Sequence, residues 1–313
     1  MEIISLEGVE IRLAHPDELD VDWVGGDHLM EQLLAAWMVL ADGDLPMNPR
    51  LIGKPGVGKT TLAYAAAAKR LKRPVYIFQA TMDTRPEDLI ITPVVGPSQQ
   101  ILYVASAVVT AMIKGGVCIL DEGNRMSEKS WAGLAPLLDN RRYVESLVAG
   151  VKIRAHPDFR FVVTMNQDAS TFDLPEYIQS RLQPQIEVPF PSREEERQIL
   201  KYNLPFSPEE LLDFTADFLA RAHAAEEPFT VRDGISILRY ALKLADRRGV
   251  AKTGKNAADQ RRACVEQAVG QVVGQSAKRY LQDGKPVPRK RRRGEVLPED
   301  FFAAGGEDGD DKA

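Results

Sequence analysis

The sequence is poor in the residues that build disulfide frameworks and metal clusters. Its 313 residues include two cysteines and four histidines, which excludes a disulfide-stapled fold and a zinc cluster. The histidines show no ligand spacing, which argues against a catalytic metal held by histidine. No apolar run approaches the roughly 18 residues of a spanning helix, and the N-terminus lacks the basic start and cleavage site of a signal peptide. We therefore expect a cytoplasmic protein with no membrane insertion.

The chain also lacks a large excess of charge of either sign. Its 40 basic and 45 acidic residues leave a net charge of −5, so no global basic field favours binding to nucleic acid. With 44% hydrophobic and 27% charged residues, the composition is that of an ordinary globular protein and excludes a wholly disordered chain. The length predicts two folded units.

Four segments differ in pattern. Residues 1–22 alternate apolar and polar side chains and predict an N-terminal adaptor strand that extends a sheet within the chain, with partner binding as the alternative. Residues 23–190 predict an α/β domain, which begins with a helix carrying the stripe Leu33, Leu34, Trp37 and Leu40. Residues 191–285 predict a helical domain. Residues 286–313 form a charged tail, basic at 289–293 and acidic beyond; its basic run is either a solvated segment or a nuclear or nucleic-acid patch.

Short apolar runs alternate with helical stretches in the α/β domain, which is typical of a mostly parallel five-stranded sheet covered by helices. Two β-hairpins are predicted near 90–104 and 143–154, the first close to a helix. After residue 190 three apolar stripes at helical spacing predict helices around 211–222, 235–245 and 265–273. The expected strands of the sheet are 50–53, 75–81, 117–121, 160–166 and 186–188.

The strongest motif is a complete G-x-x-x-x-G-K-[ST] loop between the first strand and a helix. Its glycines allow backbone N–H groups to surround phosphates at a helix N-terminus. Lys59 is expected to reach the β- and γ-phosphates, and the Thr60 hydroxyl to bind Mg²⁺. The pattern predicts a nucleoside triphosphate site, since Thr61 breaks the dinucleotide fingerprint. The predicted nucleotide-binding residues are Gly53, Pro55, Gly56, Val57, Gly58, Lys59, Thr60 and Thr61.

Two further strands end in polar side chains at the sheet edge where open α/β sheets bind ligands. Asp121 and Glu122 follow the apolar run 117–120. Asp121 is predicted to hold Mg²⁺ and Glu122 to act as general base for the attacking water; the alternative is a solvated acidic turn. Asn166 ends the run 161–165 and is predicted to help Glu122 position that water, or else simply starts a turn.

With these motifs in place, the sequence resembles the AAA+ ATPases, in particular the MoxR-like branch with its CbbQ/NorQ and dynein-related relatives. The resemblance covers about residues 24–244. It rests on the phosphate loop, on the stretches 121–125 and 161–166, on the segment 174–182, and on the two hairpins. It implies a P-loop core with a five-stranded sheet, hairpins in the second helix and before the Asn166 strand, a helical lid and a hexameric ring.

The resemblance also implies roles for individual residues. Asn166 matches the first sensor, and Arg181 the arginine finger that reaches a neighbour's γ-phosphate. Arg232 matches the second sensor of the lid. The alternatives are a surface ion pair for Arg181 and an exposed lid arginine for Arg232. Residues 24–26, including the predicted nucleotide-binding residues Val24 and Gly25, match the segment beside adenine, and Gln79 lies where a polar residue restrains the catalytic glutamate.

These features predict an enzyme that hydrolyses ATP with Mg²⁺. For MoxR-like relatives the implied role is a homo-oligomeric ring that remodels or matures a client protein, one with a von Willebrand factor A domain. The alternatives are a nucleic-acid-stimulated AAA+ motor and a nucleotide-gated scaffold with little turnover. The sequence names neither the client nor the ring stoichiometry, and the preference for ATP over GTP comes from the resemblance.

Overall fold

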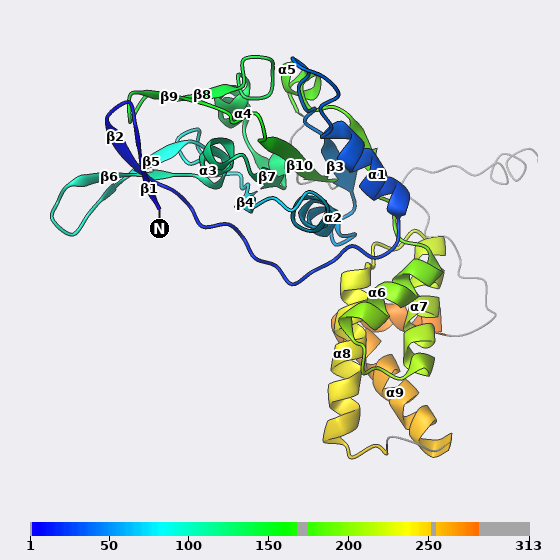
Figure 1. Ribbon diagram of the computed structural model, residues 1–313. Helices are drawn as coiled ribbons and strands as arrows, with labels where there is room; N and C mark the ends of the chain where they lie inside the picture. The colour runs from blue at the N-terminus through cyan, green and yellow to red at the C-terminus, as the bar shows by residue number, and fades with distance from the viewer. Residues whose placement is uncertain (1, 168–173, 252–254, 282–313) are drawn as a thin grey trace, which may run out of the picture.

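A computed structural model describes residues 2–167, 174–251 and 255–281, and the predicted charged tail at 286–313 lies outside them. The centre of the molecule is a five-stranded parallel sheet (Figure 1). This confirms the predicted fold class. In spatial order its strands are β11 (Gln185–Glu187), β3 (Arg50–Gly53), β10 (Arg160–Asn166), β7 (Val117–Asp121) and β4 (Val75–Gln79).

Helices cover both faces of this sheet, which explains why its inner strands are continuous apolar runs. The core on one face includes side chains of α1 (Asp27–Ala36) and α2 (Lys59–Ala65), which continues as a π-turn over Ala66–Arg70. The core on the other face includes side chains of α3 (Ala107–Lys114) and α4 (Glu128–Leu134). The short helix α5 (Glu176–Gln179) precedes β11.

Both predicted hairpins are present, at the end of the α/β part away from the helical region (Figure 1). β5 (Ile91–Val95) and β6 (Ile101–Ala105) form the first, and β8 (Tyr143–Ser146) and β9 (Val151–Arg154) the second. The N-terminal strand extends the first hairpin, as expected: β2 (Val9–Arg12) pairs with β6, and an unpredicted strand, β1 (Ile3–Leu6), pairs with β2. The resemblance implied that the first hairpin interrupts the second helix. Instead, the hairpin lies between β4 and α3 and directly precedes α3.

The predicted stripe of the first helix is wrong at its end. α1 stops at Ala36, and although Leu33 and Trp37 are buried, Leu40 is 79% exposed. The Trp37 indole donates to the Phe161 carbonyl oxygen at 2.9 Å, and the Trp37 carbonyl accepts from Arg160 Nε at 2.7 Å. These two long-range bonds fix Trp37 against the sheet, and the chain after it leaves the helix axis.

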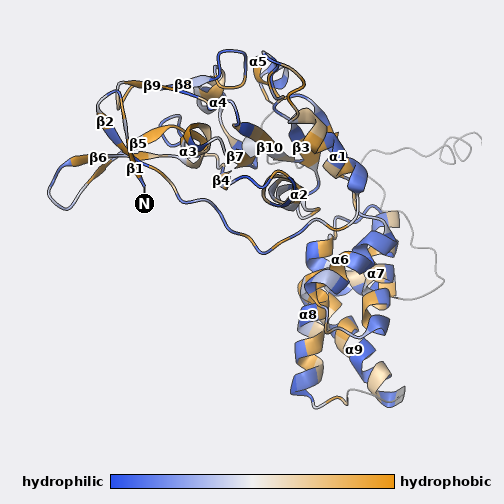
Figure 2. Ribbon diagram, viewed as in Figure 1, coloured by the Kyte–Doolittle hydropathy of each residue, from blue (hydrophilic) through white to orange (hydrophobic). Residues whose placement is uncertain are grey.

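The C-terminal region is helical, as predicted. It contains α6 (Arg193–Asn203), α7 (Glu209–Ala224), α8 (Val231–Arg247), α9 (Lys255–Val272) and a 3₁₀ segment at Gln275–Leu281. The three predicted stripes contribute to one common core, which is separate from the cores on the two faces of the sheet. Val272 is the exception within its stripe, with 39% of its surface exposed. The helices carry apolar and polar faces (Figure 2). Among the described residues, no helix is both long and apolar enough to cross a bilayer.

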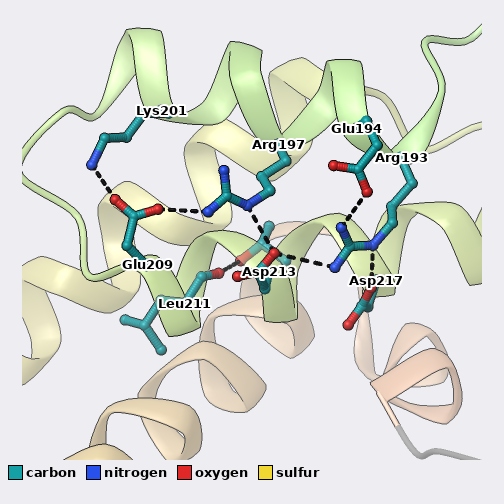
Figure 3. Close-up of polar contacts among 9 residues, drawn as sticks. Arg193, Glu194, Arg197, Lys201, Glu209, Leu211, Asp213 and Asp217 are labelled. Atoms are coloured by element: carbon teal, nitrogen blue, oxygen red, sulfur yellow. Dashed lines mark hydrogen bonds and ion pairs between the residues drawn. The ribbon is translucent and has the colours of Figure 1, made fainter.

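A network of ion pairs joins α6 to α7 along their polar faces (Figure 3). Arg193 pairs with Asp217 at 2.6 Å and Asp213 at 3.2 Å, and Arg197 pairs with Asp213 at 2.8 Å. Glu209 accepts from both Arg197 and Lys201. A single exposed pair contributes little, but a network with shared carboxylates holds several side chains in one arrangement. The two helices are therefore fixed to each other as one unit.

Candidate nucleotide site

The phosphate loop connects β3 to α2 and is shaped by its glycines. Gly56 and Gly58 have φ angles of +84° and +98°, in the left-handed region that suits glycine. Gly58 caps α2, so the first N–H groups of the helix point into the loop. Lys59 is buried and its Nζ donates to the Gly53 carbonyl at 2.9 Å and the Lys54 carbonyl at 2.8 Å. The predicted lysine is thus held at the centre of the loop.

Gly56 has a second constraint, because the C-terminal helical region from α6 onward, here called the lid, lies against it. A Cβ at this position would come within 2.7 Å of the Thr230 hydroxyl oxygen, just before α8. We expect Gly56→Ala to displace the loop from the lid and to weaken nucleotide binding at least tenfold, measured by titration calorimetry. Gly8→Ala is the matched control, since Gly8 has the same φ of +84° but nothing within 4 Å of its Cβ position. Equal affinities for both variants would contradict this reading.

The Asp121 carboxylate closes one side of the loop. Its Oδ1 accepts from the Thr60 hydroxyl at 2.7 Å and also from the Thr164 hydroxyl. β7 and β10 are neighbouring strands, so their ends bring these groups together. A threonine hydroxyl beside a carboxylate at a sheet edge is the hard-oxygen donor set that Mg²⁺ takes together with phosphate oxygens. The two predicted metal residues therefore fit the ion.

Glu122 and Asn166 meet directly. Asn166 Nδ2 donates to Glu122 Oε1 at 2.9 Å, while Asn166 Oδ1 accepts from Lys59 Nζ at 2.9 Å. Asn166 is buried. Its backbone is held by Asn124, whose Nδ2 donates to the Asn166 carbonyl at 2.8 Å and whose Oδ1 accepts from the Asn166 N–H at 3.3 Å. One rigid amide thus links the predicted general base to the phosphate-loop lysine. The predicted roles of Asn166 at the terminal phosphate and at the attacking water stay predictions.

Arg125 is a member of this site that sequence reasoning missed. Its Nε lies 2.6 Å from Glu122 Oε2, three residues along the chain. Glu122 itself has a φ of +56°, an uncommon conformation for a non-glycine residue, and its backbone N–H donates to the Thr164 hydroxyl at 3.0 Å. Gln79, which was predicted to restrain Glu122, ends β4 beside Asp121. It is not among the described partners of the Glu122 carboxylate, which are Asn166 and Arg125. The spacing Glu122-x-x-Arg125 was the available signal.

A cavity of about 280 Å³ adjoins the phosphate loop, between the α/β part and the helical region. Its walls come from the linker before α1, from the loop, and from α6 and α8. Trp23 and Tyr202, which were not predicted, add aromatic surface. The cavity thus combines apolar and aromatic side chains with two arginines, Arg232 and Arg239, a lining that suits a ligand with a flat base and charged phosphates. Six predicted residues line it: Val24, Gly56, Val57, Gly58, Thr61 and Arg232.

Gly25 follows Val24 of this cavity and packs closely against Glu195 of α6. A Cβ on Gly25 would come within 2.8 Å of Glu195. The neighbouring Gly26 N–H donates to Glu195 Oε1 at 2.8 Å, while Glu195 Oε2 accepts from the Ser192 N–H at the start of α6. Gly53 is similarly crowded by the Val188 carbonyl. These two predicted residues shape the site by close packing and do not line the cavity. Pro55, Lys59 and Thr60 are likewise absent from its described walls.

Arg181 lies outside this cavity. It follows α5, and its Nε is 3.3 Å from Asp139 Oδ2, while its guanidinium also donates to the Tyr177 carbonyl. Arg141 pairs with the same carboxylate at 2.8 Å. Hydrogen bonds from Arg141 and then Arg181 hold the pKa of Asp139 well below its ordinary value. The Arg181 side chain is 29% exposed, and its role as an arginine finger stays a prediction.

Helix α6 carries a buried acid. Glu196 is fully buried, and its two carboxylate oxygens have no hydrogen-bond partner within the described part of the chain. His223 Nδ1 lies 3.5 Å from Glu196 Oε1, and its ring stacks on Phe190 with centroids 4.0 Å apart. Burial raises the pKa of Glu196 to about 8 and lowers the pKa of His223. The folded protein therefore binds a proton at Glu196 that the unfolded chain releases near pH ~4.3.

The contribution of Glu196 to stability must then fall as pH rises, whereas the lowered pKa of His223 acts in the opposite direction. Between about pH 4.5 and 8 the native state holds more protons at Glu196 than the unfolded state, so the part of the free energy of unfolding that comes from Glu196 decreases across this window and levels off above it. We expect Glu196→Gln to flatten this dependence and to stabilise the protein at pH 8.5 by roughly 1–4 kcal/mol. Urea unfolding at pH 6 and 8.5 measures it, with the exposed Glu194→Gln on the same helix as control. An unchanged slope in Glu196→Gln would refute the assignment.

Comparison with known proteins finds a family model that covers the phosphate loop, Glu122 and Asn166. Residues 50–182 match the AAA domain of the dynein-related subfamily. An uncharacterized protein of Staphylococcus aureus (strain USA300) is 29% identical over 128 residues, which are 40% of this chain and 48% of that protein. An uncharacterized protein of Staphylococcus epidermidis (strain ATCC 12228) is 24% identical over 221 residues, 67% of this chain and 83% of that protein. The first match thus spans about half of its relative.

Solved structures show the same fold at low sequence identity. The RuvB Holliday junction branch migration motor of Thermotoga maritima superposes with a TM-score of 0.53 at 17% identity, covering 77% of this chain and 69% of that one. A point mutant of the same RuvB gives a TM-score of 0.54 at 18% identity, with 77% and 70% coverage. These likenesses establish the AAA+ α/β fold with a parallel five-stranded sheet and a C-terminal helical region.

Proposed function

We propose that this chain, which carries an AAA domain of the dynein-related subfamily, is a Mg²⁺-dependent ATPase that works as a MoxR-like ring on a client protein. The observation that supports it most directly is the Lys59–Asn166–Glu122 connection. It joins a phosphate-binding cation, a polar sensor and a general base in one chain of hydrogen bonds. A phosphate-binding scaffold without turnover has no need of the carboxylate at the end of that chain.

The residues divide the work of hydrolysis. The N–H groups of the loop and the Lys59 ammonium bind the β- and γ-phosphates. Glu122 accepts a proton from a water as that water forms a bond to the γ-phosphorus, and the bond from the γ-phosphorus to the bridging oxygen breaks to leave ADP and phosphate. Asn166 holds both the water and the base in place. Arg232, at the start of α8, neutralises charge from the lid side.

Thr60 and Asp121 are the residues that would hold Mg²⁺. The ion supplies neutralisation of charge on the β- and γ-oxygens. Thr164, which bonds Asp121 from the neighbouring strand, keeps the carboxylate facing the loop. Thr60 and Asp121 are already in hydrogen-bond contact at 2.7 Å, so little rearrangement of the protein is needed when the ion arrives with the nucleotide.

Arg181 is proposed to complete this site in a neighbouring copy. A guanidinium is permanently charged and fork-shaped, which suits the equatorial oxygens of a transferring phosphoryl group. In its own chain the Arg181 guanidinium pairs with Asp139 and donates to the Tyr177 carbonyl. Supply from a second chain makes turnover depend on assembly, and a hexameric ring satisfies every site at once.

The client is proposed to be a protein with a von Willebrand factor A domain. This part rests on the MoxR-like resemblance. The tips of the two hairpins support client contact, because Leu147 is 90% and Val95 78% exposed, and both hairpins lie at the end of the molecule away from the lid (Figure 1). Apolar side chains grouped at exposed tips are typical of surfaces that bind other proteins.

An assay of ATP turnover against protein concentration tests the proposal. We expect the rate per chain to rise steeply with concentration and to require Mg²⁺. A rate that is measurable but independent of concentration would refute the shared site. No turnover at any concentration would favour a nucleotide-gated scaffold, and stimulation by DNA at physiological salt would favour a nucleic-acid motor. The Glu122→Gln form, which should bind ATP without releasing the client, is the bait for identifying that client.

A further inference from the structure

The chain after α1 forms an exposed apolar loop. Five of the side chains between residues 38 and 47 are large, apolar and 39% to 79% exposed. Residues 38–47, here called the α1 loop, also contain two acidic residues, Asp42 and Asp44. Large apolar side chains that are grouped on a surface are typical of sites that bind another protein. The five are Met38, Val39, Leu40, Leu45 and Met47.

The α1 loop is held in a fixed shape. Asp44 accepts from the Leu40 N–H at 2.8 Å and from the Leu45 N–H at 2.9 Å, which closes the loop on itself. The Met47 N–H returns to the Ala36 carbonyl at 2.9 Å. A surface that is already ordered loses little conformational entropy when it binds. The exposed side chains are therefore presented in a conformation ready for docking.

The α1 loop adjoins Arg181. Asn48, directly after the loop, donates from Nδ2 to the Leu138 carbonyl at 3.0 Å and to the Arg181 carbonyl at 3.4 Å. Asp139, the ion-pair partner of Arg181, is the next residue after Leu138. A single amide therefore ties the apolar loop, the proposed finger and its carboxylate into one face of the molecule.

A groove of complementary character lies on the helical region. It has a volume of about 640 Å³, and its lining includes the apolar side chains of Phe206, Pro208, Leu242 and Val250. Phe206 is 72% exposed. Arg239 and Lys243 on α8 give the groove positive charge, and Asp246 is the one carboxylate in its described lining. A third basic residue of the lining, Arg261, is paired with Glu210.

This groove, here called the lid groove, shares one lining residue with the nucleotide cavity. Arg239 lines both, because the N-terminal half of α8 borders the nucleotide and the C-terminal half borders the groove. Ser207 also lines the groove, and its buried hydroxyl has no hydrogen-bond partner in the described part of the protein. A polar group left unsatisfied at a groove is relieved when an incoming backbone supplies a partner.

We infer that the α1 loop of one copy docks in the lid groove of the next copy. The inference rests on the proposed function, which brings Arg181 of one copy to the nucleotide of another. On one copy the apolar acidic loop lies beside Arg181, and on the other the apolar basic groove lies beside the nucleotide. When Arg181 of one copy reaches the nucleotide of the other, the α1 loop therefore reaches the lid groove. Asp42 meets the rim of Arg239 and Lys243, while Leu40 and its neighbours cover Phe206.

The loop and the groove of one chain do not reach each other. α1 begins near the helical region and ends away from it, so the α1 loop lies beside α5 at the far side of the sheet domain (Figure 1). The groove lies on α7–α9 of the helical bundle. Contact between them therefore requires two copies, which makes the arrangement head-to-tail and able to close into a ring.

Cysteine cross-linking tests this contact in the full chain. Cys118 and Cys264 are both buried, so Leu40→Cys together with Phe206→Cys adds the reactive pair. With ATP and a short bis-maleimide, we expect a ladder of covalent oligomers on a denaturing gel. Each single variant should stop at a dimer or less, and Ile3→Cys with Phe206→Cys is the matched control with an exposed apolar position elsewhere. A cross-link within one chain, or no ladder, would overturn the inference.

A charge exchange separates this failure from failure of the proposed function. Asp42→Lys and Lys243→Asp should each raise the concentration for half-maximal turnover about tenfold, and the double variant should restore it. Affinity for nucleotide, measured at a concentration below assembly, should stay constant in all three. If wild-type turnover rises with concentration but neither variant shifts it, the docking contact is wrong and the shared site stands. If wild-type turnover is itself independent of concentration, the shared site is wrong.

Discussion

Glu122→Gln is expected to lower ATP turnover by about 10²–10⁴-fold, because it removes the general base. The amide keeps the size of the carboxylate, so the hydrogen bond from Asn166 to Oε1 has an acceptor in the variant as well. Lys59, Thr60 and Asp121 are unchanged, and nucleotide affinity should stay within about threefold of the wild type, since the phosphate contacts determine it. Steady-state phosphate release and equilibrium binding of a fluorescent ATP analogue measure the two quantities.

Glu128→Gln is the matched control for this substitution. Glu128 is an exposed acid in the first turn of α4, six residues along the chain from Glu122. It should retain wild-type turnover. Loss of turnover in Glu128→Gln as well as in Glu122→Gln would mean that general negative charge near this edge is needed. Full turnover in Glu122→Gln would remove Glu122 from the role of base.

Arg181→Ala is expected to lower turnover by about 10³–10⁵-fold, the range for an arginine finger in phosphoryl transfer. Affinity for nucleotide should change little, because the Arg181 side chain contacts Asp139 and the Tyr177 carbonyl in its own chain, while the phosphate loop of that chain is unchanged. Arg181→Lys should recover only a small part of the rate, since an ammonium does not offer two parallel donors. Turnover at saturating ATP and at a concentration that permits assembly is the measurement.

Arg141→Ala is the matched control for the finger. Arg141 pairs with the same Asp139 carboxylate as Arg181, and it is the more exposed of the two. If Arg181 only stabilises this ion pair, both variants should lose the same modest stability and keep their turnover. If Arg181 acts at a neighbour's phosphate, turnover separates the two by orders of magnitude. Equal turnover would contradict the proposed role.

The central sheet and its chemistry could be predicted from the sequence because their signals are local. Apolar runs ending in a charged or polar residue give both the strands and the edge at which Glu122 and Asn166 meet. The phosphate loop has fixed spacing, since a turn, a close approach and a helix start must each fall at one residue. The glycine positions and the ligands Lys59 and Thr60 therefore follow from composition and order alone.

The rest depends on contacts between distant segments. Trp23 and Tyr202 share the nucleotide cavity although they lie far apart in the chain, and no periodicity indicates that pairing. The end of α1 is set by bonds between Trp37 and the strand around Arg160, so the helical pattern alone carried the prediction one turn too far. Arg125 was missed for another reason: an arginine three residues after an acid is usually a surface pair, and only the position of Glu122 gives it a role.

Mixing the two inactive variants tests the central claim most directly. Arg181→Ala chains keep Glu122, and Glu122→Gln chains keep Arg181, so a site formed between one of each has both groups. Random assembly of an equal mixture places such sites at about one quarter of the interfaces, and we predict turnover near that fraction of the wild-type rate. A mixture no more active than its two components would show that hydrolysis does not use an arginine from the adjacent copy.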